Sequence, residues 1–327
     1  MKLQQHESLV PAVKVSHFDA ERGGVRKYLF DFGHAVAEGT SFPSPDRPSH
    51  LIVSCSTQCG CPMGCEFCGS GQSFVCSLSA VEMAEQVRHM LMDRGLAEGA
   101  FRSYEVRFSA MGEPLLNFHA VDACVRWLHA HLRELEFLIC TTAPRANHEA
   151  LLDLGADIAT LQLQFSVHAS LDEERNAMIP FKAKLSLQEL AELGRQWLVA
   201  TGRKPYFNYC AMPDNSSRTD ACRLGEIFDP ELWRANISAL CEVRPQCADG
   251  LGEAHQLACR FAARMAKVGF ESRVESNEAR NRVGGGNGQL WQVQGWMAVN
   301  ADRVLASAGR RQLRTDQAAR RDQCTTP

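Results

Sequence analysis

Short hydrophobic runs alternate along most of the chain with longer segments in which apolar residues recur every three or four positions. Six such pairs follow one another after residue 50, and their apolar runs read LIVSC, YEVRFSA, FLICTT, LQLQFSV, YFNYCAM and ANISALC. A buried run followed by an amphipathic helix is typical of a β–α unit, and a series of these units predicts a parallel sheet. We therefore expect an α/β fold, either a doubly wound open sheet or a full or partial barrel.

Two of the predicted helices have well-marked beginnings. Ser79 with Glu82, and Ser186 with Glu189, have the spacing of a capping box, in which serine and glutamate satisfy the first backbone amides of a helix. The first of these helices has one apolar face, formed by Met83, Ala84, Val87, Met90 and Leu91. Methionine and leucine at this spacing indicate packing against a core rather than a cofactor site.

The segment before residue 50 has a different pattern. Apolar and polar residues alternate in VKVSHF, VRKYLFDF and HAVAEG, and Gly23-Gly24 separates the first two runs. Alternation with a period of two predicts strands joined by turns. We expect an antiparallel β ribbon over 1–48, a core over 49–300 and a C-terminal tail over 301–327.

The tail differs from the rest of the chain in charge. It contains six arginines and three aspartates, a net charge of +3, whereas the whole chain has a net charge of −3, which leaves −6 for the remainder. Because its alanine, glutamine and arginine residues offer little to pack, we expect a disordered, solvated tail, with RNA contact as the alternative.

The chain contains 14 cysteines. Its N-terminus, MKLQQHESLVPAV, lacks the apolar run of a signal peptide, and no stretch has the roughly 18 apolar residues that span a membrane. We therefore expect a protein of the reducing cytoplasm, where clustered cysteines indicate metal binding or catalysis rather than disulfides.

Six cysteines fall within the 26 residues LIVSCSTQCGCPMGCEFCGSGQSFVC. Three of them, Cys61, Cys65 and Cys68, have the spacing C-x₃-C-x₂-C directly after the first predicted strand of the core. Thiolates suit zinc or iron–sulfur clusters. A structural zinc site usually takes its four ligands as two distant pairs, and no second pair is evident. A four-iron cluster on three cysteines leaves one iron open; zinc and incidental buried cysteines are the alternatives.

These cysteines and four further motifs resemble the radical S-adenosylmethionine (SAM) superfamily. STQCGCPMGCEFCGSG, AMGEPLLN, FSVHAS, DEERNAMIP and NGQL are similar to motifs of the RNA adenine C2-methyltransferases that act on ribosomal and transfer RNA. The resemblance covers roughly residues 24–295. It implies a partial (β/α)₆ barrel with the antiparallel ribbon at its N-terminal side.

The resemblance implies that Cys61, Cys65 and Cys68 hold a [4Fe-4S] cluster whose fourth iron binds SAM. One electron from a flavodoxin- or ferredoxin-type partner would then cleave SAM to a 5′-deoxyadenosyl radical, chemistry that requires a cofactor. By the same resemblance, seven residues would contact SAM. They are Phe67, Gly112, Glu113, Cys140, Ser166, Val167 and His168.

Some of these SAM contacts also have a physical rationale. The carboxylate of Glu113 suits the ammonium group of SAM, and Gly112 lets the backbone approach closely; a simple turn is the alternative. His168 is either a SAM contact or a satisfied core histidine. Cys140 stands where the family has a serine.

The sequence departs from the family at its two relay cysteines. Asn287 stands at the position of the methyl-carrying cysteine, and an amide cannot act as a thiolate nucleophile. The second relay cysteine corresponds to Ser54. Cys55 is one residue further, which in a strand places it on the opposite face. Cys324 lies far along the chain in the basic tail, and we do not expect it to substitute for the relay cysteine.

Three further departures concern the substrate and SAM. Glu38 matches the family's proton-accepting glutamate, with a solvated strand-end carboxylate as the alternative. An asparagine that the family uses for SAM is replaced near Cys241. Because the predicted ribbon starts by residue 12, we expect the family's accessory N-terminal RNA-binding domain to be missing.

Three hypotheses follow. The first is a radical SAM enzyme that has lost the cysteine relay and acts on an unassigned substrate. The second is an RNA adenine C2-methyltransferase that uses Cys55 or another thiol, although phosphate binding requires a basic face that a chain of net charge −3 does not suggest. The third is a non-catalytic metal-binding protein.

Overall fold

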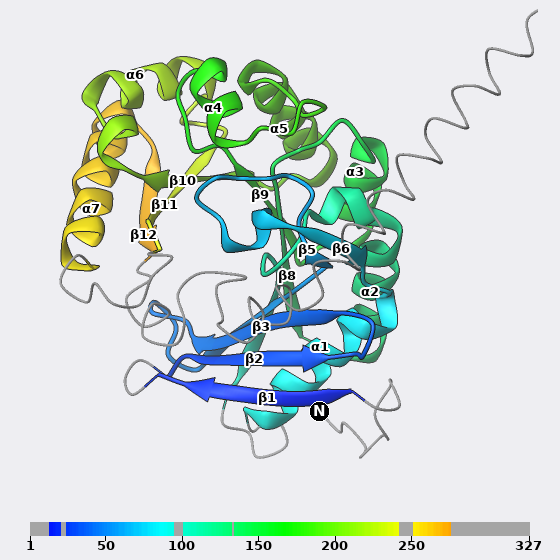
Figure 1. The fold of residues 1–327 in the computed structure, drawn as a ribbon. Coiled ribbons are helices and arrows are strands. Elements are labelled where there is room, and N and C mark those ends of the chain that lie inside the picture. Colours follow the sequence, from blue (N-terminus) through cyan, green and yellow to red (C-terminus); the bar gives the residue numbers. More distant parts are fainter. Residues whose placement is uncertain (1–12, 21–23, 95–100, 133, 242–250, 276–327) are drawn as a thin grey trace, which may run out of the picture.

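The computed structural model describes residues 13–20, 24–94, 101–132, 134–241 and 251–275 (Figure 1). Ten strands form one sheet in the order β1-β2-β3-β4-β7-β8-β9-β10-β11-β12. Of the described strands, β1 and β12 are the two edges of this sheet. The tail over 301–327, Asn287 and Cys324 lie outside the described residues.

The sheet has an antiparallel part and a parallel part. The antiparallel part contains β1 (Lys14–Asp19), β2 (Arg26–Asp31) and β3 (Val36–Pro43), and β3 pairs with β4. The parallel strands are β4 (His50–Cys55), β7 (Ser103–Phe108), β8 (Leu135–Thr141), β9 (Leu161–Ser166), β10 (Tyr206–Ala211), β11 (Arg234–Ala239) and β12 (Glu271–Glu275). The predicted α/β fold with a parallel sheet is confirmed, and the antiparallel strands extend the same sheet.

Seven helices follow the parallel strands and lie along the outside of the sheet (Figure 1). They are α1 (Ala80–Asp93), α2 (Phe118–His131), α3 (His148–Asp157), α4 (Asp172–Met178), α5 (Leu187–Thr201), α6 (Arg218–Ile227) and α7 (Leu251–Val268). Both predicted capping boxes are present, at the starts of α1 and α5. Among the described residues, no helix is both long and apolar enough to cross a bilayer.

The two faces of the parallel strands differ in character. In β4, Leu51, Val53 and Cys55 belong to the hydrophobic core that the helices cover. Ser54, between the last two, lines a cavity on the inner face. In β7, Arg107 lies on this inner face as well, and Val106 and Phe108 are buried in the core. Side chains alternate between the two faces of a strand. The apolar residues of β4 and β7 therefore face the helices, and the polar residues Ser54 and Arg107 lie on the inner face.

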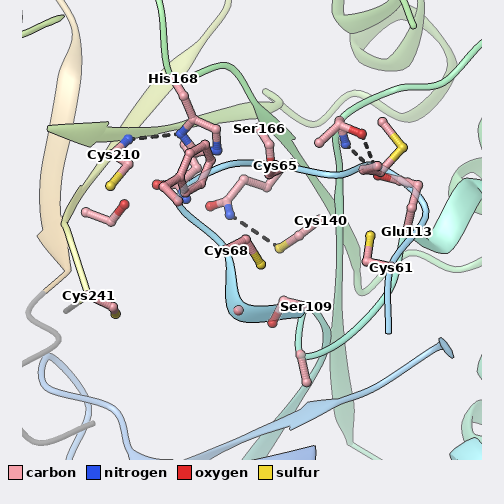
Figure 2. Close-up of a pocket in the computed structure, with 18 of the residues that line it drawn as sticks. Cys61, Cys65, Cys68, Ser109, Glu113, Cys140, Ser166, His168, Cys210 and Cys241 are labelled. Atoms are coloured by element: carbon pink, nitrogen blue, oxygen red, sulfur yellow. Dashed lines mark hydrogen bonds between the residues drawn. The ribbon is translucent and has the colours of Figure 1, made fainter. Parts of the chain in front are cut away.

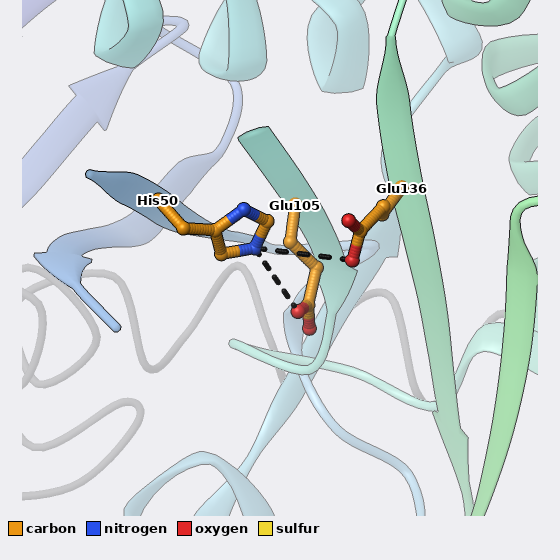
Figure 3. Close-up of side chains that lie close together, drawn as sticks. All are labelled: His50, Glu105 and Glu136. Atoms are coloured by element: carbon orange, nitrogen blue, oxygen red, sulfur yellow. Dashed lines mark ion pairs between the residues drawn. The ribbon is translucent and has the colours of Figure 1, made fainter. Parts of the chain in front are cut away.

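A network of charged side chains lies at the amino ends of β4, β7 and β8 (Figure 3). His50 Nε2 is 3.6 Å from a Glu105 oxygen and 4.0 Å from a Glu136 oxygen. Arg47 Nη2 lies 2.9 Å from His50 Nε2 and 2.9 Å from Glu136 Oε2. Because this guanidinium contacts two of the three atoms that a metal ion would need, the group is an internally paired network.

Candidate active site

The three clustered cysteines lie in the loop of a β hairpin, next to the carboxyl ends of the parallel strands. β5 (Gln58–Gly60) pairs with β6 (Phe74–Ser77), and the short helix η1 (Gly69–Gln72) follows Cys68 directly. Gly60 has a φ of +76°, and a Cβ there would lie 2.1 Å from the Ser73 carbonyl oxygen. This turn therefore requires glycine. The sequence predicted the loop but not the hairpin.

The hairpin loop and the carboxyl ends of the strands enclose a cavity of about 250 Å³ (Figure 2). Cys61, Cys65 and Cys68 line it together with Glu113. Active sites of β/α barrels lie at this end of the strands because the loops that follow them converge there. The cavity is therefore the candidate active site.

The spacing of the three sulfur atoms favours a cluster over a single ion. Among the described residues, the one group of three potential metal ligands within 4.8 Å of one another is the His50 network, so the three thiols are not packed that tightly. A tetrahedral zinc ion with bonds of about 2.3 Å would hold its sulfur ligands about 3.8 Å apart. In a four-iron cluster each thiolate binds a different iron, which requires wider spacing. At least one pair of these thiols is thus more than 4.8 Å apart, which disfavours a single zinc ion shared by all three and leaves room for a larger cluster.

Burial raises the pKa of all three thiols. The pKa of Cys65 rises to about 12, and neighbouring Cys68 and Glu113 add to the effect of burial. The pKa of the Cys61 thiol is raised for the same reasons. At Cys68, hydrogen bonds from Ser70 and Gly71 oppose burial and lower the pKa in part. Thiols of this kind stay protonated when free, and binding to a metal stabilises the thiolate.

Glu113 places a buried carboxylate at the edge of this cavity, just before η3 (Pro114–Asn117). Both carboxylate oxygens accept hydrogen bonds: from Thr142 N at 2.8 Å, from Thr142 Oγ1 at 2.7 Å, from Thr141 Oγ1 at 2.5 Å and from Leu115 N at 3.0 Å. Burial raises the pKa of Glu113, and these donors oppose the shift. Within the described residues no cation pairs with it, so the site suits an incoming ammonium group.

Gly112 holds Glu113 against the cysteine hairpin. Its φ is +99°, and a Cβ would lie 2.6 Å from both Gln58 Cβ and Thr57 Oγ1. The next residue donates its backbone N–H to Gln58 Oε1 at 2.9 Å. Only glycine permits this close approach with this backbone conformation. The predicted reason for glycine at this position therefore agrees with the geometry.

His168 lies opposite the cysteine loop, in the left-handed backbone region with a φ of +62°. Its Nδ1 accepts a hydrogen bond from Cys210 N at 3.0 Å, which assigns the ring proton to Nε2. Burial, with a smaller effect of Arg175, lowers its pKa to about 3. The ring of Phe67 packs edge-on against it at 4.9 Å. The neutral ring therefore has one N–H donor that this bond leaves available.

The other predicted SAM contacts differ in their positions. Cys140 and Ser166 line the cavity, and Gln164 Nε2 lies 3.3 Å from the Cys140 sulfur. Burial raises the pKa of Cys140 to about 12. Val167 instead belongs to the hydrophobic core, and its backbone N–H donates to Asn208 O.

The structure does not bring Cys55 to the cavity. Its thiol is buried against α1 and approaches the backbone oxygens of Ser56 at 3.4 Å and Met83 at 3.7 Å. Burial raises its pKa well above the usual range. Ser54, one residue earlier, lines the cavity, as the alternation of side chains along β4 requires.

Glu38 lies on β3, inside the protein. Its carboxylate accepts a hydrogen bond from Lys27 Nζ at 2.8 Å, and both side chains are fully buried. The alternative of a solvated strand-end carboxylate is therefore wrong. Glu38 is not among the residues that line the cavity, and it influences the site by raising the pKa of Cys68.

Several residues of the site were not predicted from the sequence. Cys210 and Cys241 line the cavity, and Cys241 adds to the effect of burial in raising the pKa of Cys210 to about 12. Arg175 is buried near Cys65. Arg107 also lines the cavity. The alternation of charged residues in YEVRFSA is the signal that could have indicated a polar inner face.

A solved structure has the same fold. The radical SAM methyltransferase from Sphaerobacter thermophilus superposes with a TM-score of 0.68, covering 85% of this chain and 81% of its own, at 22% identity. No family model matches the chain. The chain therefore has the fold of this radical SAM methyltransferase.

In sequence, the chain is similar to proteins named as RlmN-type RNA methyltransferases. It is 33% identical to the probable dual-specificity RNA methyltransferase RlmN of Frankia casuarinae over 203 residues, which are 59% of this chain and 48% of that protein. It is 29% identical to the RlmN of Moorella thermoacetica over 293 residues, 86% of this chain and 80% of that protein. The chain thus spans about half the length of the first relative.

Proposed function

We propose that this chain is a radical SAM enzyme that lacks the cysteine relay and acts on a substrate other than the RNA adenine. The observation that carries the proposal is the shared cavity of Cys61, Cys65, Cys68 and Glu113, in which no cation of the described residues forms an ion pair with the buried carboxylate. A purely structural metal site would not need this carboxylate.

Each residue of the cavity has a role in this proposal. Cys61, Cys65 and Cys68 would hold the [4Fe-4S] cluster, and Glu113 would bind the ammonium group of SAM. When bound, the cluster and SAM supply reductive cleavage to a 5′-deoxyadenosyl radical. The Nε2–H of His168 is positioned as a donor. The electron would come from a flavodoxin- or ferredoxin-type partner in a reducing compartment.

The loss of the relay is supported by two residues. Ser54 lines the cavity at the position where the family has its resolving cysteine, and a hydroxyl cannot replace a thiolate there. Cys55 is enclosed in the core. The cavity is therefore suited to hydrogen abstraction from a substrate that needs no covalent thiol intermediate.

A second candidate function is RNA methylation with a different thiol. Cys210 and Cys241 both line the cavity, and the curated relatives are named RNA methyltransferases. A thiolate at one of these positions would accept the methyl group of SAM and release S-adenosylhomocysteine. The raised pKa of Cys210 disfavours its thiolate at neutral pH.

The test is anaerobic reconstitution with iron and sulfide, followed by SAM and dithionite. The wild-type protein should bind about four irons and release 5′-deoxyadenosine. The Cys65→Ser variant should lose both the bound iron and the release of 5′-deoxyadenosine. Cys76→Ser is the matched control, because Cys76 lies on the same hairpin but outside the cavity. Zinc without iron in anaerobically purified protein would sink the proposal.

Mass spectrometry separates the two candidate functions. Under the first, the reconstituted protein carries no methyl group after incubation with SAM. Under the second, a single methyl group appears on a cysteine, and Cys241→Ser or Cys210→Ser removes it. A methylated cysteine would also contradict the proposed loss of the relay.

A further inference from the structure

Arg175 on α4 is a buried cation behind the cysteine loop. It is 1% exposed, and its guanidinium donates to three backbone carbonyl oxygens: Leu185 at 2.7 Å, Thr142 at 2.9 Å and Ser166 at 3.1 Å. Thr142 follows β8 and Ser166 ends β9, so Arg175 joins two strand ends that line the cavity.

Arg175 has no direct counter-ion among the described residues. No carboxylate there lies within ion-pair distance, and its buried Nε has no hydrogen-bond partner. Burial lowers its pKa to about 10, and Asp172, Cys65 and Glu113 act in the opposite direction from longer range. A buried cation without a paired anion is costly, so a negative charge nearby is expected.

The same segment supports the cysteine loop. Glu66 N donates to Met178 O at 3.1 Å, and Ile179 belongs to a small apolar cluster with Met63 and Cys65. Arg175 therefore lies on the helix that supports the side of the cavity where the three thiols lie.

We propose that Arg175 is the counter-charge of the iron–sulfur cluster and raises its reduction potential. The inference rests on the proposed function, because it requires the cluster. A cluster held by three thiolates carries negative charge, and reduction adds one more. A cation in a poorly polarisable environment stabilises the reduced form more than the oxidised form. Arg175 is thus a positioning residue that acts through the cluster and not on the substrate.

The test compares Arg175→Lys with Arg175→Gln in the reconstituted full chain, by redox titration followed by electron paramagnetic resonance. Both side chains can donate to the carbonyl oxygens, but only lysine keeps the charge. The midpoint potential of R175Q should shift to more negative values, and that of R175K should stay near the wild type. Arg145→Met is the control, because Arg145 pairs with Glu189 at the surface and its charge is screened.

Iron content extends the comparison to variants that hold the cluster poorly. Wild-type iron in R175K together with loss of iron in R175Q would also support the role of the charge. Equal behaviour of the two variants, in potential or in iron content, overturns the inference and leaves the proposed function intact. Absence of an iron–sulfur signal in the wild-type protein overturns both.

Discussion

The two ends of the polar inner face differ in whether their charged side chains are paired within the protein. At the amino ends of the strands, His50 lies within ion-pair distance of Glu105 and Glu136 (Figure 3). Arg47 bonds to both His50 and Glu136. At the carboxyl ends, Glu113 is bonded by neutral donors alone in the described part of the chain (Figure 2). Buried charges are usually paired. The charged groups at the amino end are paired within the protein and therefore have a structural role, whereas the unpaired carboxylate at the carboxyl end suits a charged ligand.

Two more polar groups support this distinction. Asn208 Oδ1 and Arg175 Nε are two of six buried side-chain atoms without a hydrogen-bond partner in the described structure, and the other four belong to residues that do not line the cavity. Asn208 lines the cavity, and Arg175 bonds to strand ends that line it. An unpaired buried polar atom costs about 1–3 kcal/mol, which a bound cofactor or substrate can recover. The comparison predicts that mutations at the amino end change stability and mutations at the carboxyl end change binding.

The largest expected effect is at the amino end, in Glu105→Gln. Glu105 accepts a hydrogen bond from Arg107 at 2.5 Å, and the change leaves this buried guanidinium with the longer contact to Glu275 at 3.5 Å. We expect the free energy of unfolding to fall by about 3–5 kcal/mol, measured by urea denaturation of the apo protein. A loss below about 1 kcal/mol would mean that the network is not a structural element.

The pH dependence of the same pair gives an independent measurement. Burial would raise the pKa of Glu105, but Arg107 and His50 outweigh it and lower the pKa to about 2. A depressed carboxyl pKa contributes stability above the unfolded value of about 4.3, and this contribution is lost as the pH falls towards 2. The difference in stability between wild type and E105Q should therefore shrink between about pH 4.5 and 2. A constant difference over this range would exclude the ion pair as its cause.

At the carboxyl end, Glu113→Gln should affect the binding of SAM. Glutamine keeps the size of the side chain but loses its charge, so we expect the dissociation constant of SAM to rise roughly 10- to 100-fold in the reconstituted protein. Because burial already raises the pKa of Glu113, the apo protein should lose less stability than in E105Q. Equilibrium dialysis and urea denaturation give the two numbers, and an unchanged affinity would contradict the proposed role of Glu113.

Hydrophobic periodicity and cysteine spacing predicted much of the fold and the centre of the site. The runs LIVSC and YEVRFSA became β4 and β7, and alternation along β4 correctly separated Ser54 from Cys55. β12 was missed because ESRVE has little hydrophobic character, and β5 because it has three residues.

Contacts between distant segments could not be predicted in the same way. Asn117 Nδ2 bonds to Thr57 O and Leu78 O, residues 60 and 39 positions away, and thereby fixes the Gly-Glu turn against the hairpin. The burial of Arg175 depends on carbonyl groups from three segments. Periodicity reports which face of an element is covered, but it does not report which charges remain unpaired once the elements are packed.

The smallest expected effect is in Glu136→Gln at the partly exposed rim of the amino-end network. The side chain is 40% exposed and pairs with Arg47, which is 50% exposed. Ion pairs of this kind contribute about 0–1 kcal/mol and weaken with salt. We expect a loss of at most about 1 kcal/mol in urea denaturation at low salt, a smaller loss at high salt, and an unchanged affinity for SAM. A weaker affinity for SAM in E136Q would show that the two ends of the inner face are coupled, and the separation of stability from binding would then fail.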